Sequence, residues 1–142
     1  LFYELQGLNS LTVSYELAMG KIKSLGGAIP RGIFSYGSLP LMHVRNCPVR
    51  ASIGCAACGE NGSLTDRKQV VFPVECQQRR AATLLNSVPL DLSGRTLSGL
   101  DFQLLYFTRE SEDEIAAVTR RVQQGEKSNE PHTTGLYYRD LL

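Results

Sequence analysis

The sequence lacks the features that mark a membrane protein or a general nucleic-acid coat. No apolar run approaches the roughly 20 residues that span a bilayer, and the start has no basic-then-apolar signal peptide. Fifteen Lys or Arg against fourteen Asp or Glu leave a formal net charge of +1, so no large field of one sign is present. We therefore expect a cytoplasmic protein with no membrane role.

Hydrolytic machinery is also scarce in this sequence. The only histidines are His43 and His132, and neither an HExxH nor a GxSxG motif occurs. A cysteine nucleophile with His43 as its base is the one peptidase arrangement that these residues suggest. Four clustered thiols are better explained as ligands.

The strongest positive signal is a window that holds all four cysteines of the chain, Cys47, Cys55, Cys58 and Cys76. In a reducing compartment such thiols are more often metal ligands or redox groups than disulfides, although two disulfides remain the structural alternative. Two residues separate Cys55 from Cys58, which can place both thiolates on one ion. Zinc ribbons usually pair two such close couples, so the irregular spacing favours an iron-sulfur cluster and leaves zinc open.

The first part of the chain reads as strand, helix and strand. A strand is predicted over Leu11–Glu16, followed by a helix that ends at Gly26 and Gly27. The run Gly32–Met42 predicts a second strand that enters a loop, broken by Pro40 near its end. The cysteine window then follows as a loop rich in glycine and small residues.

The second part predicts further strands and one well-marked helix. QVVFPVEC reads as a strand that ends at the fourth cysteine, and Asn86 reads as a turn residue in the next extended segment. Leu100–Thr108 gives the clearest pattern of a buried strand in the chain. Ser111 and Glu114 form a capping-box pattern at the start of a helix, and the aromatic end of the tail is expected to dock.

This alternation favours one α/β region with parallel strands, as an open sheet or as part of a barrel. We divide it into a strand-helix-strand part over 1–45, a cysteine-rich metal loop over 46–80, and a strand-helix part with the tail over 81–142. The first residue is Leu1, and the residues after it read like the middle of an element. We expect the chain to be a piece of a longer protein.

A set of ordered motifs resembles the collagenase-like peptidases, peptidase family U-thirty-two. They are TVSYEL, YGSLPLM, NCP, the Cys55–Cys58 pair, LTDR, FPV, LLNS and TTGLYYR, and they cover most of the chain. The resemblance implies the later strands of a TIM-barrel-like fold. Some members are similar to proteins that hydroxylate RNA or a quinone precursor without oxygen and hold a [4Fe-4S] cluster on four cysteines.

The resemblance therefore implies that Cys47, Cys55, Cys58 and Cys76 hold a [4Fe-4S] cluster in part of an enzyme, with RNA or a small aromatic molecule as substrate. The fragment itself is expected to be inactive alone. Peptidase activity on a peptide substrate is one alternative. A non-catalytic module stabilised by zinc is another.

Candidate substrate-binding residues follow the predicted strands, because barrel chemistry takes place at the carboxyl ends of strands. Glu16 is either an acid at the barrel mouth or the first residue of a helix. Arg45 can clamp a carboxylate or phosphate, or form an ordinary surface ion pair. Asp66 and Arg67 are expected to pair with each other and fix their loop, with substrate contact as the second role.

Overall fold

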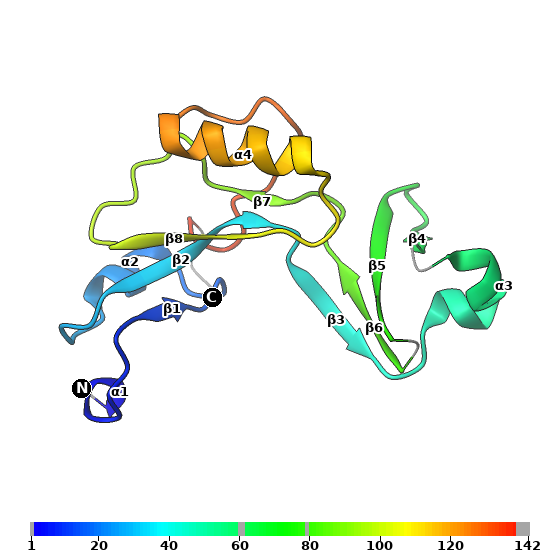
Figure 1. Cartoon of the computed structure of the whole chain (residues 1–142), viewed down its shortest axis with the longest axis horizontal. Coiled ribbons are helices and arrows are strands. Elements are labelled where there is room, and N and C mark those ends of the chain that lie inside the picture. Colours follow the sequence, from blue (N-terminus) through cyan, green and yellow to red (C-terminus); the bar gives the residue numbers. More distant parts are fainter. Residues whose placement is uncertain (1, 60–61, 79, 139–142) are drawn as a thin grey trace. The chain divides into compact units, whose positions relative to one another are not determined.

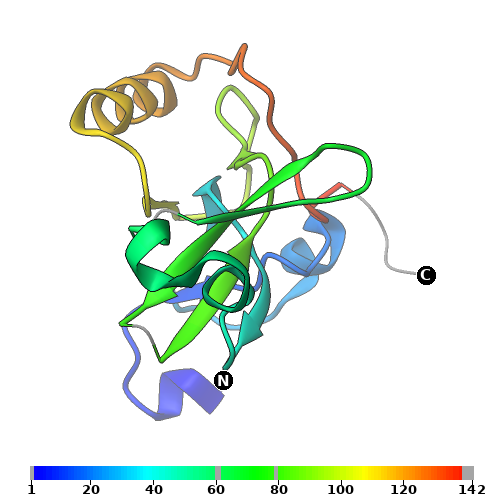
Figure 2. The same cartoon turned by 90° about the vertical axis from the view of Figure 1, so that its right-hand side faces the viewer.

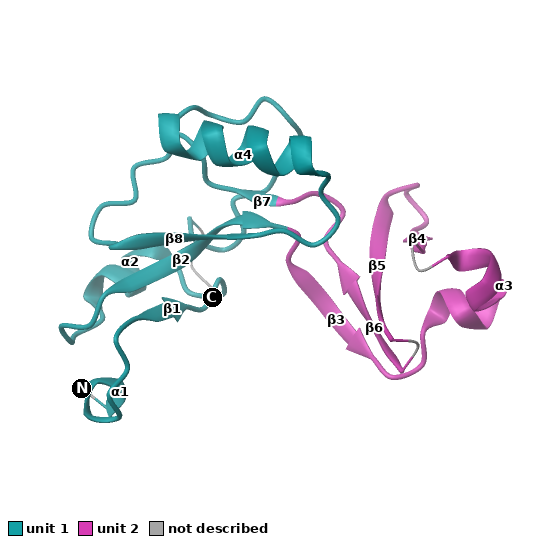
Figure 3. Cartoon of the chain, viewed as in Figure 1, with its two compact units in different colours: residues 1–37, 90–142 teal, residues 38–89 magenta. Residues whose placement is uncertain are grey.

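The chain forms two compact units, which a computed structural model describes over residues 2–59, 62–78 and 80–138. Unit 1 combines residues 1–37 with residues 90–142, and unit 2 is the intervening segment 38–89 (Figure 3). Both units contain helix and strand, which is compatible with the predicted α/β class, but the described strand pairs of unit 2 are antiparallel and not parallel as predicted. None of the described helices is long and apolar enough to cross a membrane.

Unit 1 consists of a small sheet and three helices, visible in Figure 1. Its elements are α1 (Phe2–Leu5), β1 (Leu11–Val13), α2 (Met19–Ser24), β2 (Arg31–Gly37), β7 (Leu90–Asp91), β8 (Phe102–Tyr106) and α4 (Glu112–Gln124).

Strand β2 is the centre of this sheet. Both β1 and β8 run parallel to it, and both pair with Gly32 and Ile33. Because one edge of a strand cannot pair with two neighbours at the same residues, β1 and β8 lie on opposite edges of β2. The short β7 pairs antiparallel with Tyr36 and Gly37. The sheet is open over the described residues, so they do not form a closed barrel.

The core of unit 1 is made by side chains from both helices and strands. Ile22 of α2 and Ile33 of β2 are fully buried, and Val118 of α4 is 5% exposed. The tail docks here, as predicted, because Tyr137 is 1% exposed and its carbonyl accepts the Met19 amide at 2.7 Å. Burial of these apolar side chains is the main stabilising term of the unit.

Two sequence predictions in unit 1 have clear outcomes. The capping box is confirmed, because Ser111 Oγ accepts from the Glu114 amide and the Glu114 carboxylate accepts from the Ser111 amide. The predicted strand near Leu100–Thr108 is also present, as β8, but the prediction that this strand is buried is wrong. None of its residues is buried, and Tyr106 is 45% exposed. Among the described strands β8 pairs only with β2, so its other edge has no neighbour to cover it.

Unit 2 is an antiparallel sheet in the order β3-β6-β5-β4, with one helix. Its elements are β3 (Pro40–Val44), α3 (Pro48–Cys58), β4 (Ser63–Thr65), β5 (Val71–Gln77) and β6 (Ala81–Leu85). Helix α3 lies against one face of the sheet, as seen in Figure 2, and Val49 of α3 packs with Val74 and Ala82 of the strands.

The prediction of a single strand over Gly32–Met42 is wrong. The run holds two strands, β2 and β3, which belong to different units. Pro40 does not end a strand. It begins β3 and pairs with Leu85 of β6. A proline has no amide hydrogen to donate, so the first position of a strand tolerates it.

The cysteine window was predicted as a loop, and this prediction is also wrong over residues 48–58, which form helix α3. Pro48 stands at the first helical position, where its fixed φ favours a helix, and the alanines that follow have the highest helix propensity. Gly54 then interrupts the helix with φ 78° and ψ 159°. The glycine that suggested a loop is therefore a kink between two helical pieces.

Candidate functional site

The four cysteines lie on three different parts of unit 2. Cys47 occupies the N-cap position of α3, and its side chain makes no capping hydrogen bond. Cys55 and Cys58 lie on the piece of α3 after the Gly54 kink. Cys76 lies on β5. All four are half-buried.

Three of the four cysteines, Cys47, Cys58 and Cys76, lie on the same side of the sheet of unit 2. Cys76 and Val44 both pair with Ala82, so these three residues form a row across the strands. Side chains opposite each other in an antiparallel sheet point to the same face. Ala82 belongs to the buried cluster of unit 2, and Cys47 and Cys58 pack against that same cluster. Residues 29 positions apart in sequence are thereby gathered around one small apolar centre.

Gly62 makes a close contact in this region. A methyl group placed on its Cα would lie 2.9 Å from Cys58 Sγ and 2.9 Å from Val49 Cγ1. The Gly62 carbonyl accepts the Val74 amide at 2.9 Å, which ties this residue to β5. Any larger side chain at position 62 would have to displace Cys58 or Val49.

The cysteines are gathered but do not form a ligand group as they lie. Among the described residues, no three His, Cys, Asp or Glu side chains are placed to hold a metal ion. Cys47, Cys55 and Cys58 are free thiols, so the two disulfides that the sequence allowed are not formed. The apolar cluster brings the cysteines to one region, and metal binding would require a further approach of their sulfur atoms.

Arg45 lies next to the first cysteine and lines a hollow on the surface of unit 2. The other lining residues are Asn46, Cys47, Arg50 and Ala51. Arg50 was not predicted from the sequence, although helical spacing would have placed it one turn after Cys47. The hollow thus brings two guanidinium groups and one amide side chain beside a cysteine.

Asp66 and Arg67 form the turn between β4 and β5. Asp66 Oδ1 accepts the amides of Lys68 at 2.7 Å and Val70 at 2.9 Å, so this carboxylate fixes the turn. The expected ion pair between Asp66 and Arg67 is wrong, because Arg67 is exposed and makes no ion pair with any described residue. Neither residue lines the hollow of Arg45.

Glu16 belongs to unit 1 and is exposed in the turn that follows β1. Its amide donates to Ser14 Oγ at 3.2 Å. Helix α2 begins at Met19, three residues later, so Glu16 is not the first residue of a helix. Glu16 nevertheless follows a parallel strand, β1, as the sequence predicted.

His43 lies on the sheet face opposite Cys76. It pairs with Thr83, one position along from the Val44–Ala82 pair, and its Nδ1 is 3.0 Å from Thr83 Oγ1. Neighbouring residues of a strand point to opposite faces, so His43 does not approach Cys76 across the sheet. The arrangement gives no support to a pair of Cys76 and His43 acting as nucleophile and base.

Unit 1 holds a second polar cluster, which no sequence motif indicated. Asp91, 2% exposed, pairs with Arg121 at 2.5 Å, and Arg121 Nε also donates to Ser93 Oγ at 3.1 Å. Burial and the neighbouring carboxylate of Glu110 raise the pKa of Tyr36 to about 12. Asp91 also accepts the Ser93 amide at 2.8 Å, so the cluster is internally paired and fastens α4 to β7.

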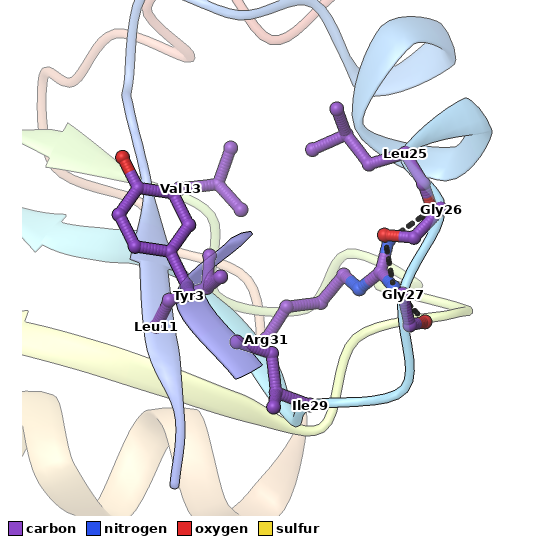
Figure 4. Close-up of a pocket in the computed structure, with 8 residues that line it drawn as sticks. All are labelled: Tyr3, Leu11, Val13, Leu25, Gly26, Gly27, Ile29 and Arg31. Atoms are coloured by element: carbon purple, nitrogen blue, oxygen red, sulfur yellow. Dashed lines mark hydrogen bonds between the residues drawn. The ribbon is translucent and has the colours of Figure 1, made fainter. Parts of the chain in front are cut away.

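Unit 1 also has a hollow beside β1, shown in Figure 4. The Arg31 guanidinium in it donates to the carbonyls of Leu25 at 2.5 Å and Gly27 at 2.9 Å. This charge is therefore used to fix the loop after α2. The rest of the lining is largely apolar: Tyr3, Leu11, Val13, Leu25 and Ile29, with Gly26 and Gly27.

Comparison of the chain with known protein families, with curated proteins and with solved structures finds no match.

Proposed function

We propose that this chain is the later part of a barrel-like protein of the collagenase-like peptidase family, and that unit 2 holds a [4Fe-4S] cluster. The cluster would support oxygen-independent hydroxylation of RNA or a small aromatic substrate in the cytoplasm. The proposal starts from the ordered motifs of the sequence. The observation that carries it is the common position of Cys47, Cys58 and Cys76 around the buried cluster of unit 2.

Three strands of unit 1 support the proposed barrel origin, whereas the short antiparallel β7 does not belong to such a pattern. Strands β1, β2 and β8 are parallel and lie side by side in their sequence order. A helix follows β1 and another follows β8, as in repeated strand-helix units. In a completed barrel, Glu16 would lie at the carboxyl end of its strand and face the site of chemistry.

The four thiols are chemically suited to an iron-sulfur cluster, but their positions in the structure are not those of a ligand group. Four thiols are the usual ligands of a [4Fe-4S] cluster. Because no group of three described ligands is in place, the second piece of α3 would have to move toward Cys47 and Cys76 when the cluster binds. The Gly54 kink is the natural hinge for this movement, since its φ of 78° already separates the two helical pieces.

A cluster bound in this unit would supply one-electron transfer. The residues of the chain would supply substrate binding, with Arg45 next to Cys47 as the first candidate. Peptidase activity, the alternative from the sequence, gains no support from the position of His43 on the opposite face of the sheet.

Single Cys→Ser variants of the four cysteines test the proposal. Each variant and the parent chain are reconstituted with iron and sulfide without oxygen, and the visible absorbance and the bound iron and sulfide are measured. We expect each replacement to reduce cluster content strongly. His43→Ala is the matched control, because it removes a potential ligand from the other face and should leave the cluster intact. Unchanged iron and sulfide in all four Cys→Ser variants would refute the proposal.

A structural zinc site is a second candidate, favoured by the small core of unit 2. Among the described residues, Val49, Val74 and Ala82 form its buried cluster, and two of the cysteines pack directly on it. Small units of this kind usually need a metal or disulfides for stability. In this case the purified chain would contain stoichiometric zinc without sulfide, and a chelator would unfold unit 2.

A further inference from the structure

The geometry points to a phosphate-binding site in unit 2, formed by Arg45, Arg50 and Asn46 around the hollow beside Cys47. This inference goes beyond the proposed cluster, because it assigns a ligand class to Arg45, the substrate-binding candidate of the proposed function, and adds Arg50 and Asn46 to the same site. It also holds for the metal-free chain, so it can be tested separately.

The first reason is that these two guanidinium groups have no partner among the residues that the structure describes. Neither Arg45 nor Arg50 makes a hydrogen bond or an ion pair with any described residue, and both are exposed. Arg31 and Arg121 differ, since carbonyl oxygens hold the first and Asp91 holds the second. Arg45 and Arg50 therefore keep all their donors for a ligand.

The second reason is that the two arginines line the same hollow from different elements. Arg45 follows β3, and Arg50 lies in the first turn of α3. Pro48, the first residue of that helix, has no amide hydrogen and therefore supplies no backbone donor to the hollow. The amide group of Asn46 adds two donors between them.

Two guanidinium groups favour a phosphate over a carboxylate. A carboxylate is satisfied by one guanidinium fork, whereas a phosphate offers three or four oxygens and up to two negative charges. Arg is also the residue that matches phosphate by paired parallel hydrogen bonds. The ligand is therefore a phosphate group, carried either by a small phosphorylated molecule or by a nucleic-acid backbone.

The charge distribution of the chain agrees with this ligand. Residues 38–89 hold six Lys or Arg and three Asp or Glu, whereas the rest of the chain holds nine and eleven. The overall charge of +1 thus conceals a basic unit 2 and an acidic remainder. Anions approaching the chain would be attracted to the unit that carries the hollow.

The test is titration of the metal-free full chain with inorganic phosphate, a nucleoside monophosphate and a short single-stranded RNA. Arginine side-chain NMR signals report the first two, and fluorescence anisotropy reports the labelled RNA. We expect Arg45→Gln and Arg50→Gln each to weaken binding about tenfold or more, as for the loss of a hydrogen bond to a charged group. Arg67→Gln is the matched control, because it removes the same charge from unit 2 outside the hollow.

The three probes distinguish the source of the phosphate. Similar affinity for the monophosphate and the RNA indicates a small phosphorylated ligand, and tighter, salt-dependent RNA binding indicates a nucleic-acid backbone. Arg45→Lys keeps the charge but loses the fork, so it should bind less tightly than the parent chain. An equal loss in Arg67→Gln would overturn the inference. So would the absence of both a shift of the Arg45 and Arg50 signals with the two small probes and an anisotropy change with the RNA.

Discussion

Replacing Gly62 with alanine should destabilise unit 2 by overpacking at Cys58. The new methyl carbon would lie 2.9 Å from Cys58 Sγ and 2.9 Å from Val49 Cγ1, and 3.0 Å from Val49 Cγ2. Favourable contacts between such atoms begin at about 3.5 Å, so the neighbours must move by roughly half an ångström or more. Gly62 does not have a positive φ, so the backbone itself tolerates alanine and the cost is one of packing.

The expected loss is about 1–3 kcal/mol in the free energy of unfolding of unit 2, the usual cost of one extra carbon in a packed core. Hydrogen exchange at the Val74 amide measures it, since this amide donates to the Gly62 carbonyl. The exchange rate should rise by about fivefold to about 150-fold if exchange follows opening of the unit. The same variant should take up less iron, because Cys58 is displaced.

The control is Gly20→Ala on α2, where no atom lies within 4 Å of the added methyl group. Alanine in place of a helical glycine should stabilise unit 1 by up to about 1 kcal/mol. Adding Val49→Ala to the Gly62→Ala variant should restore part of the packing. The double variant should therefore lose less stability than the sum of the losses in the two single variants. Unchanged Val74 exchange in the Gly62→Ala chain would refute the packing around Cys58.

Four further predictions concern unit 1. Ser111→Ala should cost about 1 kcal/mol in thermal or urea unfolding, because it removes the N-cap of α4. The Ser111 amide, and secondly the Ser111 hydroxyl, donate to the Glu114 carboxylate and hold its pKa below its usual value, so the stability from this carboxylate should be lost as the pH falls through that lowered pKa. Because alanine keeps the amide, Ser111→Ala should flatten the acid limb of the stability curve only in part. The pKa of Tyr36 is about 12, raised above the usual 10, so the stability that this phenol contributes should be complete below pH 10 and lost between pH 10 and 12. Tyr36→Phe should therefore leave the tyrosinate absorbance near pH 10 unchanged, and a clear loss of absorbance there would show that Tyr36 ionises at its usual pKa and contradict the prediction. Arg121→Met should cost about 3–5 kcal/mol because it leaves Asp91 buried without its partner, and a loss below about 1 kcal/mol would contradict the buried pair.

The sequence predicted those elements whose local signals agree with their tertiary surroundings. The helix after Ser111 has a capping box, acids in its first turn and Gly125 after its last residue, and every one of these signals is local. The strand that ends near Cys76 was also predicted, because its β-branched and aromatic run is short and clear.

The predictions that are wrong depend on contacts that the sequence does not state. The degree of burial of β8 depends on how many strands flank it, not on its own residues. The helix at Pro48–Cys58 was hidden by Gly54, since a glycine inside a helix and a glycine in a loop give the same local signal.

In the candidate site too, the sequence predicted what depends on local signals and missed what depends on tertiary contacts. The spacing of the cysteines predicted that they act together, and the register between β5 and β6 explains how Cys76 reaches the face where Cys58 packs. Arg50 was missed because a helix had not been predicted there. The Asp66–Arg67 pair is wrong because backbone amides of the turn compete successfully for the Asp66 carboxylate.

Analysis of iron, sulfide and zinc in the chain isolated without oxygen tests the central claim most directly. We predict about four iron and about four sulfide per chain, with the visible absorbance of a [4Fe-4S] cluster that disappears in Cys58→Ser. A colourless protein that contains one zinc per chain and no sulfide would contradict the cluster and favour the structural zinc site. A metal-free chain with two disulfides would contradict both.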